Sequence, residues 1–213
     1  MIAIVTRMAI VSSAEGGAER PFTAIGGHLA LTLLNTVRWR LDATQRVDDL
    51  TSYARVLDWA QQADLISDQE RIELQALAGA EPRWAAAEFD QFVRMREAAY
   101  AALVDGSLLA VDELVVAQRE ALQRARLTKA GGHWGWSEPT LSLTTPRDRA
   151  IRRVIDLLTS PDLALLHQCA DRACGWVYLD TSPRHNRRWC AAADCGNRNR
   201  ARRFYAKRAA HPG

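Results

Sequence analysis

Cysteine is absent from the first 168 residues of the chain, and all four cysteines fall in the remaining 45. The longer part therefore has neither disulfides nor thiol ligands for a metal. The chain of 213 residues is 48% hydrophobic and 25% charged, which is ordinary for a soluble protein. It is long enough for one hydrophobic core and a small additional module.

Long apolar runs are also absent. Residues 1–14 start with an apolar stretch, but Arg7 interrupts it, and no later stretch approaches the roughly 18 apolar residues of a membrane span. We therefore expect a cytoplasmic protein without a membrane segment, in which residues 1–20 form a loose leader.

The motifs of common enzymes are missing too. The chain contains no phosphate-binding loop, no Gly-x-Gly-x-x-Gly, no Gly-x-Ser-x-Gly and no His-Glu-x-x-His, and it has no internal repeat or low-complexity segment. No set of residues for catalysis is visible, so we expect that the protein is not an enzyme.

Acidic residues are scarce at the end of the chain. Residues 181–213 contain nine Lys and Arg but only one acidic residue, Asp194, whereas the whole chain has 28 basic and 25 acidic residues. The tail therefore carries a charge of about +8 and the remainder about −5. This asymmetry predicts that the tail alone approaches a polyanion.

The cysteines form two matched pairs, and this is the strongest signal in the sequence. Four residues separate the members of each pair and fifteen separate the pairs, which are Cys169 with Cys174 and Cys190 with Cys195. Four thiolates can complete the closed tetrahedral shell of a structural zinc ion. In a reducing compartment this is favoured over two disulfides, and an iron–sulfur or redox-sensing role is a further alternative.

Histidines offer another set of ligands. His167, His185 and His211 could each replace a cysteine, although four paired thiolates make this unnecessary.

A hairpin is expected between the two cysteine pairs. Residues 175–180 are typical of a strand, residues 181–186 of a turn and residues 187–189 of a returning strand. A helix from residue 161 should lead to Cys169.

A basic helix is predicted after the last cysteine. Residues 196–208 contain no proline, and Ala201, Phe204 and Tyr205 share one face, which we expect to pack on the metal site. The candidate nucleic-acid contacts are Arg187, Arg188, Arg198, Arg200, Arg202, Arg203, Lys207 and Arg208. Arg198 has an alternative role, in which it braces the metal loop through backbone carbonyls or Asp180.

The pattern before residue 160 is mainly helical. Apolar residues recur at helical spacing, which predicts helices over about 48–60, 68–78, 82–104, 111–124 and 145–158, with a hairpin within 126–143. We expect Asp48 or Thr51 to cap the first of these, and hydroxyl–proline caps at Thr145 and Ser160. The predicted fold is thus mainly α with small β hairpins, comprising a helical domain over 21–159 and a treble-clef-like four-cysteine module over 160–213.

Asn35 is the odd member of an otherwise apolar run over residues 29–37. A buried amide needs hydrogen-bond partners, so the simplest interpretation is that Asn35 satisfies backbone groups at a helix end. In the alternative, functional interpretation, His28, Asn35 and Arg38 line a pocket for a small molecule.

These motifs resemble a known family. The two cysteine pairs, the intervening residues and Cys195-Gly196-Asn197-Arg198 resemble the CGNR zinc finger, and Phe22 with residues 26–37 is similar to the opening of the ABATE domain that usually precedes that finger. The resemblance covers nearly the whole chain. It implies a bacterial stress-induced transcription regulator with zinc on the four cysteines. Thr32 departs from the family, where an acidic residue is expected.

The leading hypothesis is a transcription regulator that binds DNA through a zinc finger, with an N-terminal domain that senses a small molecule or mediates homo-oligomer assembly. Two alternatives use the same charged tail. The protein could be an RNA- or ribosome-binding accessory, or a zinc-dependent module that binds an acidic protein.

Overall fold

The computed structural model describes residues 21–210, and the predicted leader and His211 lie outside them. The fold is mainly helical, as predicted, with three small antiparallel sheets of two strands each in the described part. The α-helices are α1 (Leu29–Leu34), α2 (Tyr53–Gln62), α3 (Asp68–Ala80), α4 (Pro82–Asp105), α5 (Leu108–Arg124), α6 (Thr145–Leu158) and α7 (Asn197–Ala210). The paired strands are β1 (Val37–Arg38) with β2 (Val47–Asp48), β3 (Arg126–Ala130) with β4 (His133–Ser137), and β5 (Leu166–Gln168) with β6 (Val177–Leu179).

Local signals set most helix ends. A capping box starts α3, because the Ser67 hydroxyl accepts from the N–H of Glu70 and the Glu70 carboxylate accepts from the N–H of Ser67. Pro82 occupies the first turn of α4, and Gly106 ends that helix in the left-handed conformation at φ 65°. Ser107 then caps α5, which begins three residues before the predicted start.

Two predicted caps are wrong. Ser52, rather than Asp48 or Thr51, caps α2 by accepting a hydrogen bond from the N–H of Arg55. Thr145 is already helical, and its hydroxyl accepts from the N–H of Ser142, upstream of α6. The predicted cap at Ser160 is confirmed and opens a short 3-10 helix, η1 (Pro161–Leu165).

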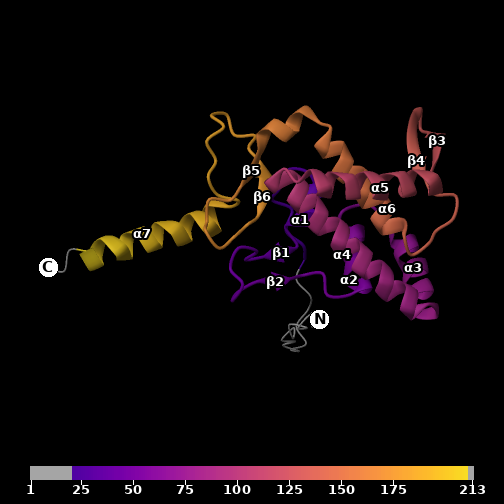
Figure 1. Ribbon diagram of the computed structural model, residues 1–213, viewed down its shortest axis with the longest axis horizontal. Helices are drawn as coiled ribbons and strands as arrows, with labels where there is room; N and C mark the ends of the chain where they lie inside the picture. Colours follow the sequence, from indigo (N-terminus) through magenta and orange to yellow (C-terminus); the bar gives the residue numbers. More distant parts are fainter. Residues whose placement is uncertain (1–20, 211–213) are drawn as a thin grey trace, which may run out of the picture.

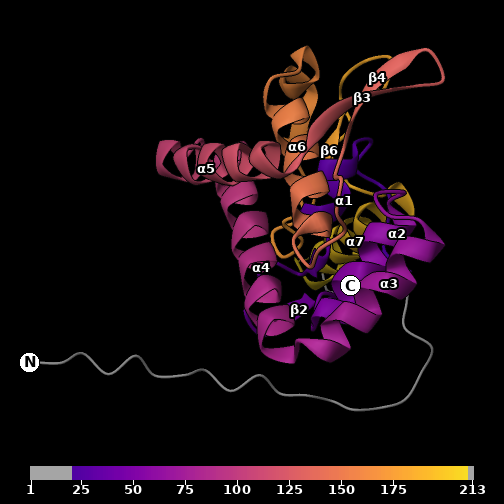
Figure 2. The same ribbon diagram turned by 90° about the vertical axis from the view of Figure 1, so that its right-hand side faces the viewer.

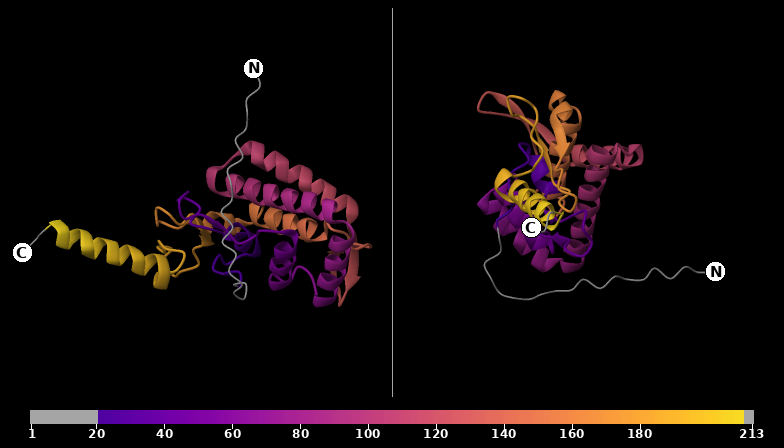
Figure 3. Two further views of the ribbon diagram at one scale, coloured as in Figure 1. Left: turned by 90° about the horizontal axis from the view of Figure 1, so that it is seen from below. Right: turned by 90° about the vertical axis from the view of Figure 1, so that its left-hand side faces the viewer.

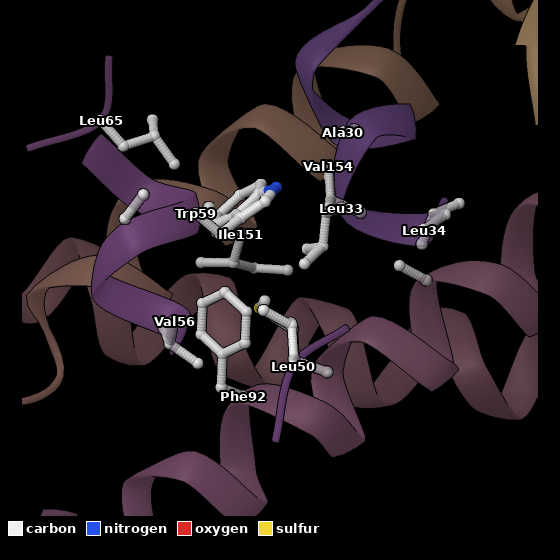
Figure 4. Close-up of a cluster of buried hydrophobic side chains, with 14 of the residues drawn as sticks. Ala30, Leu33, Leu34, Leu50, Val56, Trp59, Leu65, Phe92, Ile151 and Val154 are labelled. Carbon is white, nitrogen blue, oxygen red and sulfur yellow. The ribbon is translucent and has the colours of Figure 1, made fainter. Parts of the chain in front are cut away.

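The hydrophobic core lies where α1, α2, α4 and α6 meet (Figure 4). Trp59 of α2 packs edge-on against Phe92 of α4, with ring centroids 5.6 Å apart, and Leu33, Ile151 and Val154 surround them. All five are 1% exposed or less. Burial of such large side chains is the main stabilising contribution to this part of the fold.

A buried arginine fixes the segment between α1 and α2. Arg96 on α4 is 1% exposed, and its two terminal nitrogens donate to the Asp48 carboxylate at 2.7 and 2.6 Å. One of them also donates to the hydroxyl of Thr36 at 3.1 Å. The β1–β2 hairpin is therefore held against α4, and its loop faces the cysteine-rich segment.

The molecule is elongated, with two projections. Figure 1 shows α7 at one end of the long axis and the β3–β4 hairpin toward the other, and Figure 2 shows how that hairpin stands out from the helices. Seen from below, α7 extends away from the packed helices (Figure 3). Among the described residues, no helix combines the length and the apolar character that crossing a membrane requires.

Candidate metal centre and nucleic-acid interface

The four cysteine side chains converge on one point. Their Sγ atoms all lie within 4.8 Å of one another, and each residue is 5% exposed or less: Cys169, Cys174, Cys190 and Cys195. The Sγ of Cys190 lies 3.7 Å from that of Cys174 and 3.5 Å from that of Cys195. A tetrahedron of four Zn–S bonds of about 2.3 Å has edges of about 3.8 Å. The sulfurs are therefore already spaced for one zinc ion.

Two segments deliver the cysteines, and their geometry differs in part from the prediction. Cys169 directly follows β5, which pairs with β6, so a strand and not a helix leads to it. Residues 187–189 form no strand, which makes the predicted hairpin between the cysteine pairs wrong. A single backbone bond of 2.9 Å, from the N–H of Ala170 to the carbonyl of Arg188, brings the second pair alongside the first.

The electrostatics of the cluster favour a cation. The Cys174 and Cys190 thiols donate to the Cys169 sulfur, which lowers the pKa of Cys169 to about 2. The hydrogen-bonded contact with Cys169 in turn raises the pKa of Cys174 and of Cys190, and burial raises the pKa of Cys195. Four buried sulfurs so close together can ionise together only around a positive ion. The donor set and the spacing both fit zinc.

Asp171 organises the surroundings of the sulfurs and was missed by the sequence analysis. It is fully buried, and its carboxylate accepts from the N–H of Ala173 at 3.0 Å, from Arg198 at 3.0 Å and from Asn199 at 2.7 Å. Burial alone would raise the pKa of Asp171, but these hydrogen bonds and the Arg198 charge outweigh it and hold the pKa below its usual range. A carboxylate inside the first cysteine pair is the signal that could have indicated this role.

Arg198 braces the metal loop. Its guanidinium donates to Asp171 and, at 2.9 Å, to the Sγ of Cys195, and it lies over the Trp39 ring at 4.2 Å. Arg198 thus has the predicted bracing role, but its carboxylate partner is Asp171 and not Asp180. Asp180 accepts the backbone N–H of Arg187. Nitrogen donors to a zinc thiolate reduce its negative charge and fix its orientation.

Comparison with family models agrees with this geometry. Residues 27–161 match the ABATE model, described as "Putative stress-induced transcription regulator", and residues 166–208 match the CGNR zinc finger. The chain belongs to the ABATE family. The four cysteines are the ligands of one structural zinc ion in its CGNR finger. Neither description is that of an enzyme family, and a comparison with curated proteins finds no match.

The tetrapeptide that gives the finger its name has a physical basis in this chain. A side chain at Gly196 would place its Cβ 3.3 Å from the Trp189 ring, so glycine allows the close approach. Asn197 starts α7 and donates to the carbonyl of Ala193 at 2.8 Å. In the sequence Cys-Gly-Asn-Arg, Cys195 is thus a metal ligand, and the three residues after it close the loop around the metal.

The CGNR finger docks on the ABATE domain. The backbone N–H of Arg40 donates to the carbonyl of Cys174 at 2.9 Å, and the indole N–H of Trp176 donates to the carbonyl of Val37 at 3.0 Å. The Tyr100 hydroxyl of α4 donates to the carbonyl of Gly175 at 2.9 Å. Trp176 is therefore buried between the finger and the ABATE domain.

Helix α7 does not pack on the zinc site, which corrects the sequence prediction. Every residue of α7 is exposed or half-buried, and Phe204 and Tyr205 are 57% and 68% exposed. Their rings contact each other with centroids 5.6 Å apart, and Arg208 lies over Phe204 at 5.7 Å. The metal loop meets α7 only near its start, where Asp171 and Cys195 bind Arg198 and Asn199 and where Arg202 lies 3.4 Å from Asp171. The rest of the helix projects into solvent (Figure 3).

The eight basic residues predicted to contact nucleic acid divide into two groups. Arg187 and Arg198 are half-buried, and Arg187 donates to the carbonyl of Trp189 at 3.0 Å and covers the Tyr178 ring at 4.0 Å. The exposed group is Arg188, Arg200, Arg202, Arg203, Lys207 and Arg208, although Arg202 also lies 3.4 Å from Asp171. A cleft of about 380 Å³, lined by Arg188 and Trp189 among others, lies beside the zinc site.

The three residues predicted to line a pocket are not brought together. The His28 ring accepts a hydrogen bond from the N–H of Ala30 at the start of α1, and Arg38 pairs with Asp49 at 2.9 Å. Asn35 ends α1 and binds the backbone of β6, which matches the simpler interpretation of this residue. Ligand contact at these three positions stays a prediction, and these contacts give it no support.

Proposed function

We propose that this protein regulates transcription by binding DNA through its CGNR finger, and that the ABATE domain adjusts this activity in response to a small molecule. The observation that carries the first part is the projecting basic helix α7. Its first turn is fixed to the zinc site by Asp171 and Cys195, whereas the rest of the helix is exposed. A helix of this kind is narrow enough to enter the major groove of DNA.

The charges along α7 suit a phosphate backbone. Arg200, Arg203, Lys207 and Arg208 are exposed, while the segment before residue 181 carries a net charge of about −5. Arg188 adds a cation at the edge of the cleft beside Trp189. We expect DNA to lie across this cleft and along α7, at a distance from the ABATE domain.

The test is the salt dependence of duplex binding by the zinc-loaded chain, measured by fluorescence anisotropy. If five cations contact phosphates, the slope of log affinity against log salt concentration should be about −4 to −5. Arg200→Ala and Arg203→Ala should each lower the affinity and make the slope shallower by about 0.9. Arg119→Ala is the matched control, because Arg119 is exposed on α5 and away from the finger.

Exposed aromatic side chains on α7 favour one competing function. Phe204 and Tyr205 could stack on unpaired bases, as in proteins that bind single-stranded RNA. Competition between duplex DNA and unpaired or structured RNA at one salt concentration separates the two functions. Preferential binding of RNA, or a slope that the arginine substitutions leave unchanged, would contradict the proposal.

A further inference from the structure

A cavity at the opposite end of the molecule from α7 has the features of a ligand site. Its volume is about 490 Å³, and residues of β4, α5 and α6 line it. Figure 1 shows these three elements. The residues that matter for its chemistry are Trp134 and Trp136 of β4, Gln118 of α5, and Arg149, Arg152 and Arg153 of α6. A small molecule of one or two rings would fit this volume.

Two buried polar atoms on residues that line the cavity have no hydrogen-bond partner among the described residues. These atoms are Nη1 of Arg152 and Oε1 of Gln118. The Arg152 residue is 9% exposed, so this nitrogen lacks a partner although it is withdrawn from bulk solvent. Buried donors and acceptors are nearly always paired. Both atoms have almost no accessible surface, so a bound molecule that offers one acceptor and one donor would pair with them once the two side chains turn toward it.

Each guanidinium group around the cavity is already paired with a carboxylate. Glu138, whose side chain is 3% exposed, pairs with both Arg149 and Arg152, and Arg149 also pairs with Glu70 at 2.7 Å. Arg153 pairs with Asp156 at 3.3 Å. Asp64 adds a further carboxylate at the rim. The site therefore has no surplus positive charge that would favour an anion over an uncharged ligand.

The two tryptophans supply flat apolar faces. Trp134 and Trp136 are two residues apart on β4, so their side chains lie on the same face of the hairpin, and only Gly135 separates them. They are 65% and 51% exposed, which is unusual for the largest aromatic side chain. Exposed rings beside a cavity are well placed to stack against a planar ligand.

We propose that this cavity binds an uncharged, planar heteroaromatic molecule through stacking on Trp134 or Trp136. A carbonyl of the ligand accepts a hydrogen bond from Arg152, and a ring N–H of the ligand donates to Gln118. The inference rests on the sensing role proposed above and assigns it a site and a ligand class. Because α7 lies at the other end, the ligand and DNA do not compete for one surface (Figure 1).

The experiment is calorimetric titration of the full zinc-loaded chain with 9-methylhypoxanthine, which carries one carbonyl and one ring N–H on the same edge. Its analogue 1,9-dimethylhypoxanthine lacks that N–H and should bind about tenfold more weakly, as expected for one lost hydrogen bond. Benzoate, a planar anion, should bind more weakly than 9-methylhypoxanthine. Equal binding of the two purines, or tighter binding of benzoate, would overturn the assignment of the ligand class.

Variants locate the site. Gln118→Leu should weaken binding of 9-methylhypoxanthine about tenfold without lowering the melting temperature, since the lost amide oxygen has no partner in the described structure. Trp134→Ala should weaken binding as well. Trp84→Ala is the matched control, because Trp84 is an exposed tryptophan on α4 outside the cavity.

Failure of this inference can be told apart from failure of the proposed function. If no probe in the series binds with a Kd below about 1 mM while duplex DNA still binds, the cavity assignment is wrong and the DNA-binding role stands. If Gln118→Leu and Trp134→Ala bind 9-methylhypoxanthine as tightly as the wild type, the ligand binds elsewhere. Binding of the probe without any DNA affinity would remove only the DNA-binding role.

Discussion

Asn35 and Val177 form a pair of hydrogen bonds across 142 positions of the sequence. The Asn35 side-chain amide donates to the Val177 carbonyl at 2.9 Å, and the Val177 N–H donates to the Asn35 amide oxygen at 2.9 Å. Val177 is fully buried and Asn35 is 3% exposed. The side chain that caps the C-terminus of α1 thus pairs with β6 as a neighbouring strand would, and it joins the ABATE domain to the CGNR finger.

The substitution Asn35→Ala should lower the free energy of unfolding by about 3 kcal/mol, because it leaves a buried N–H and a buried carbonyl of Val177 without partners. Urea denaturation measures the loss. Asn186→Ala, which alters an exposed amide, serves as control and should change stability by less than about 0.5 kcal/mol. Equal effects of the two substitutions would show that the pair contributes nothing to stability.

Cys190→Ser should reduce bound zinc from one ion per chain to a small fraction, because three thiolates and a hydroxyl bind the ion far more weakly. Atomic emission measures the metal. Circular dichroism should retain most of its helical signal, since the main core contains no cysteine. Ala193→Ser, an exposed change in the same loop, should keep the zinc. Full zinc occupancy in Cys190→Ser would refute the four-cysteine site.

Arg198 and Arg203 should respond to substitution in opposite ways. Arg198→Ala removes donors to the fully buried Asp171 and to Cys195, so it should cost about 2 kcal/mol of stability and speed zinc release to a chelator. Arg203→Ala changes an exposed residue of α7, so it should leave zinc release unchanged and weaken DNA binding. The opposite outcome would mean that Arg198 contacts DNA and Arg203 braces the fold.

Glu70 should contribute to acid lability. Its pKa is lowered, chiefly by the hydrogen bond from Arg149, so the folded state holds the carboxylate in its charged form. The resulting stability is present above the unfolded value of about 4.5 and is lost as pH falls through the lower folded value.

Glu70→Gln keeps an acceptor for the Ser67 N–H but loses the charge that pairs with Arg149. At neutral pH the variant should be less stable than the wild type by at most about 1 kcal/mol. As the pH falls below 4.5, the wild type should lose more stability than the variant, and urea midpoints measured across this pH range test the difference. Glu73→Gln, an exposed change on the same helix, is the control. Parallel curves for wild type and Glu70→Gln would contradict this assignment.

Much of the architecture could be predicted because it depends on neighbours in the sequence. Ser67 with Glu70, Pro82 and Ser160 mark helix starts through bonds made within one turn. The spacing of the four cysteines predicted that their side chains converge, because two matched pairs in a chain with no other cysteine are typical of a metal site. The predicted hairpin between the cysteine pairs is wrong, because β6 pairs with β5, which precedes it, and not with residues 187–189.

The sequence by itself determined the helices, the zinc ligands and the excess of charge on the tail, because periodicity, spacing and charge are local properties. Only the tertiary structure decided which polar groups meet: Asn35 with Val177, Asp171 with Arg198, and Arg152 beside Gln118 around one cavity. It also decided that α7 projects with Phe204 and Tyr205 exposed. The physical reason is that burial and hydrogen bonding depend on segments far apart in the chain, and their pairing is fixed only when the core closes around them.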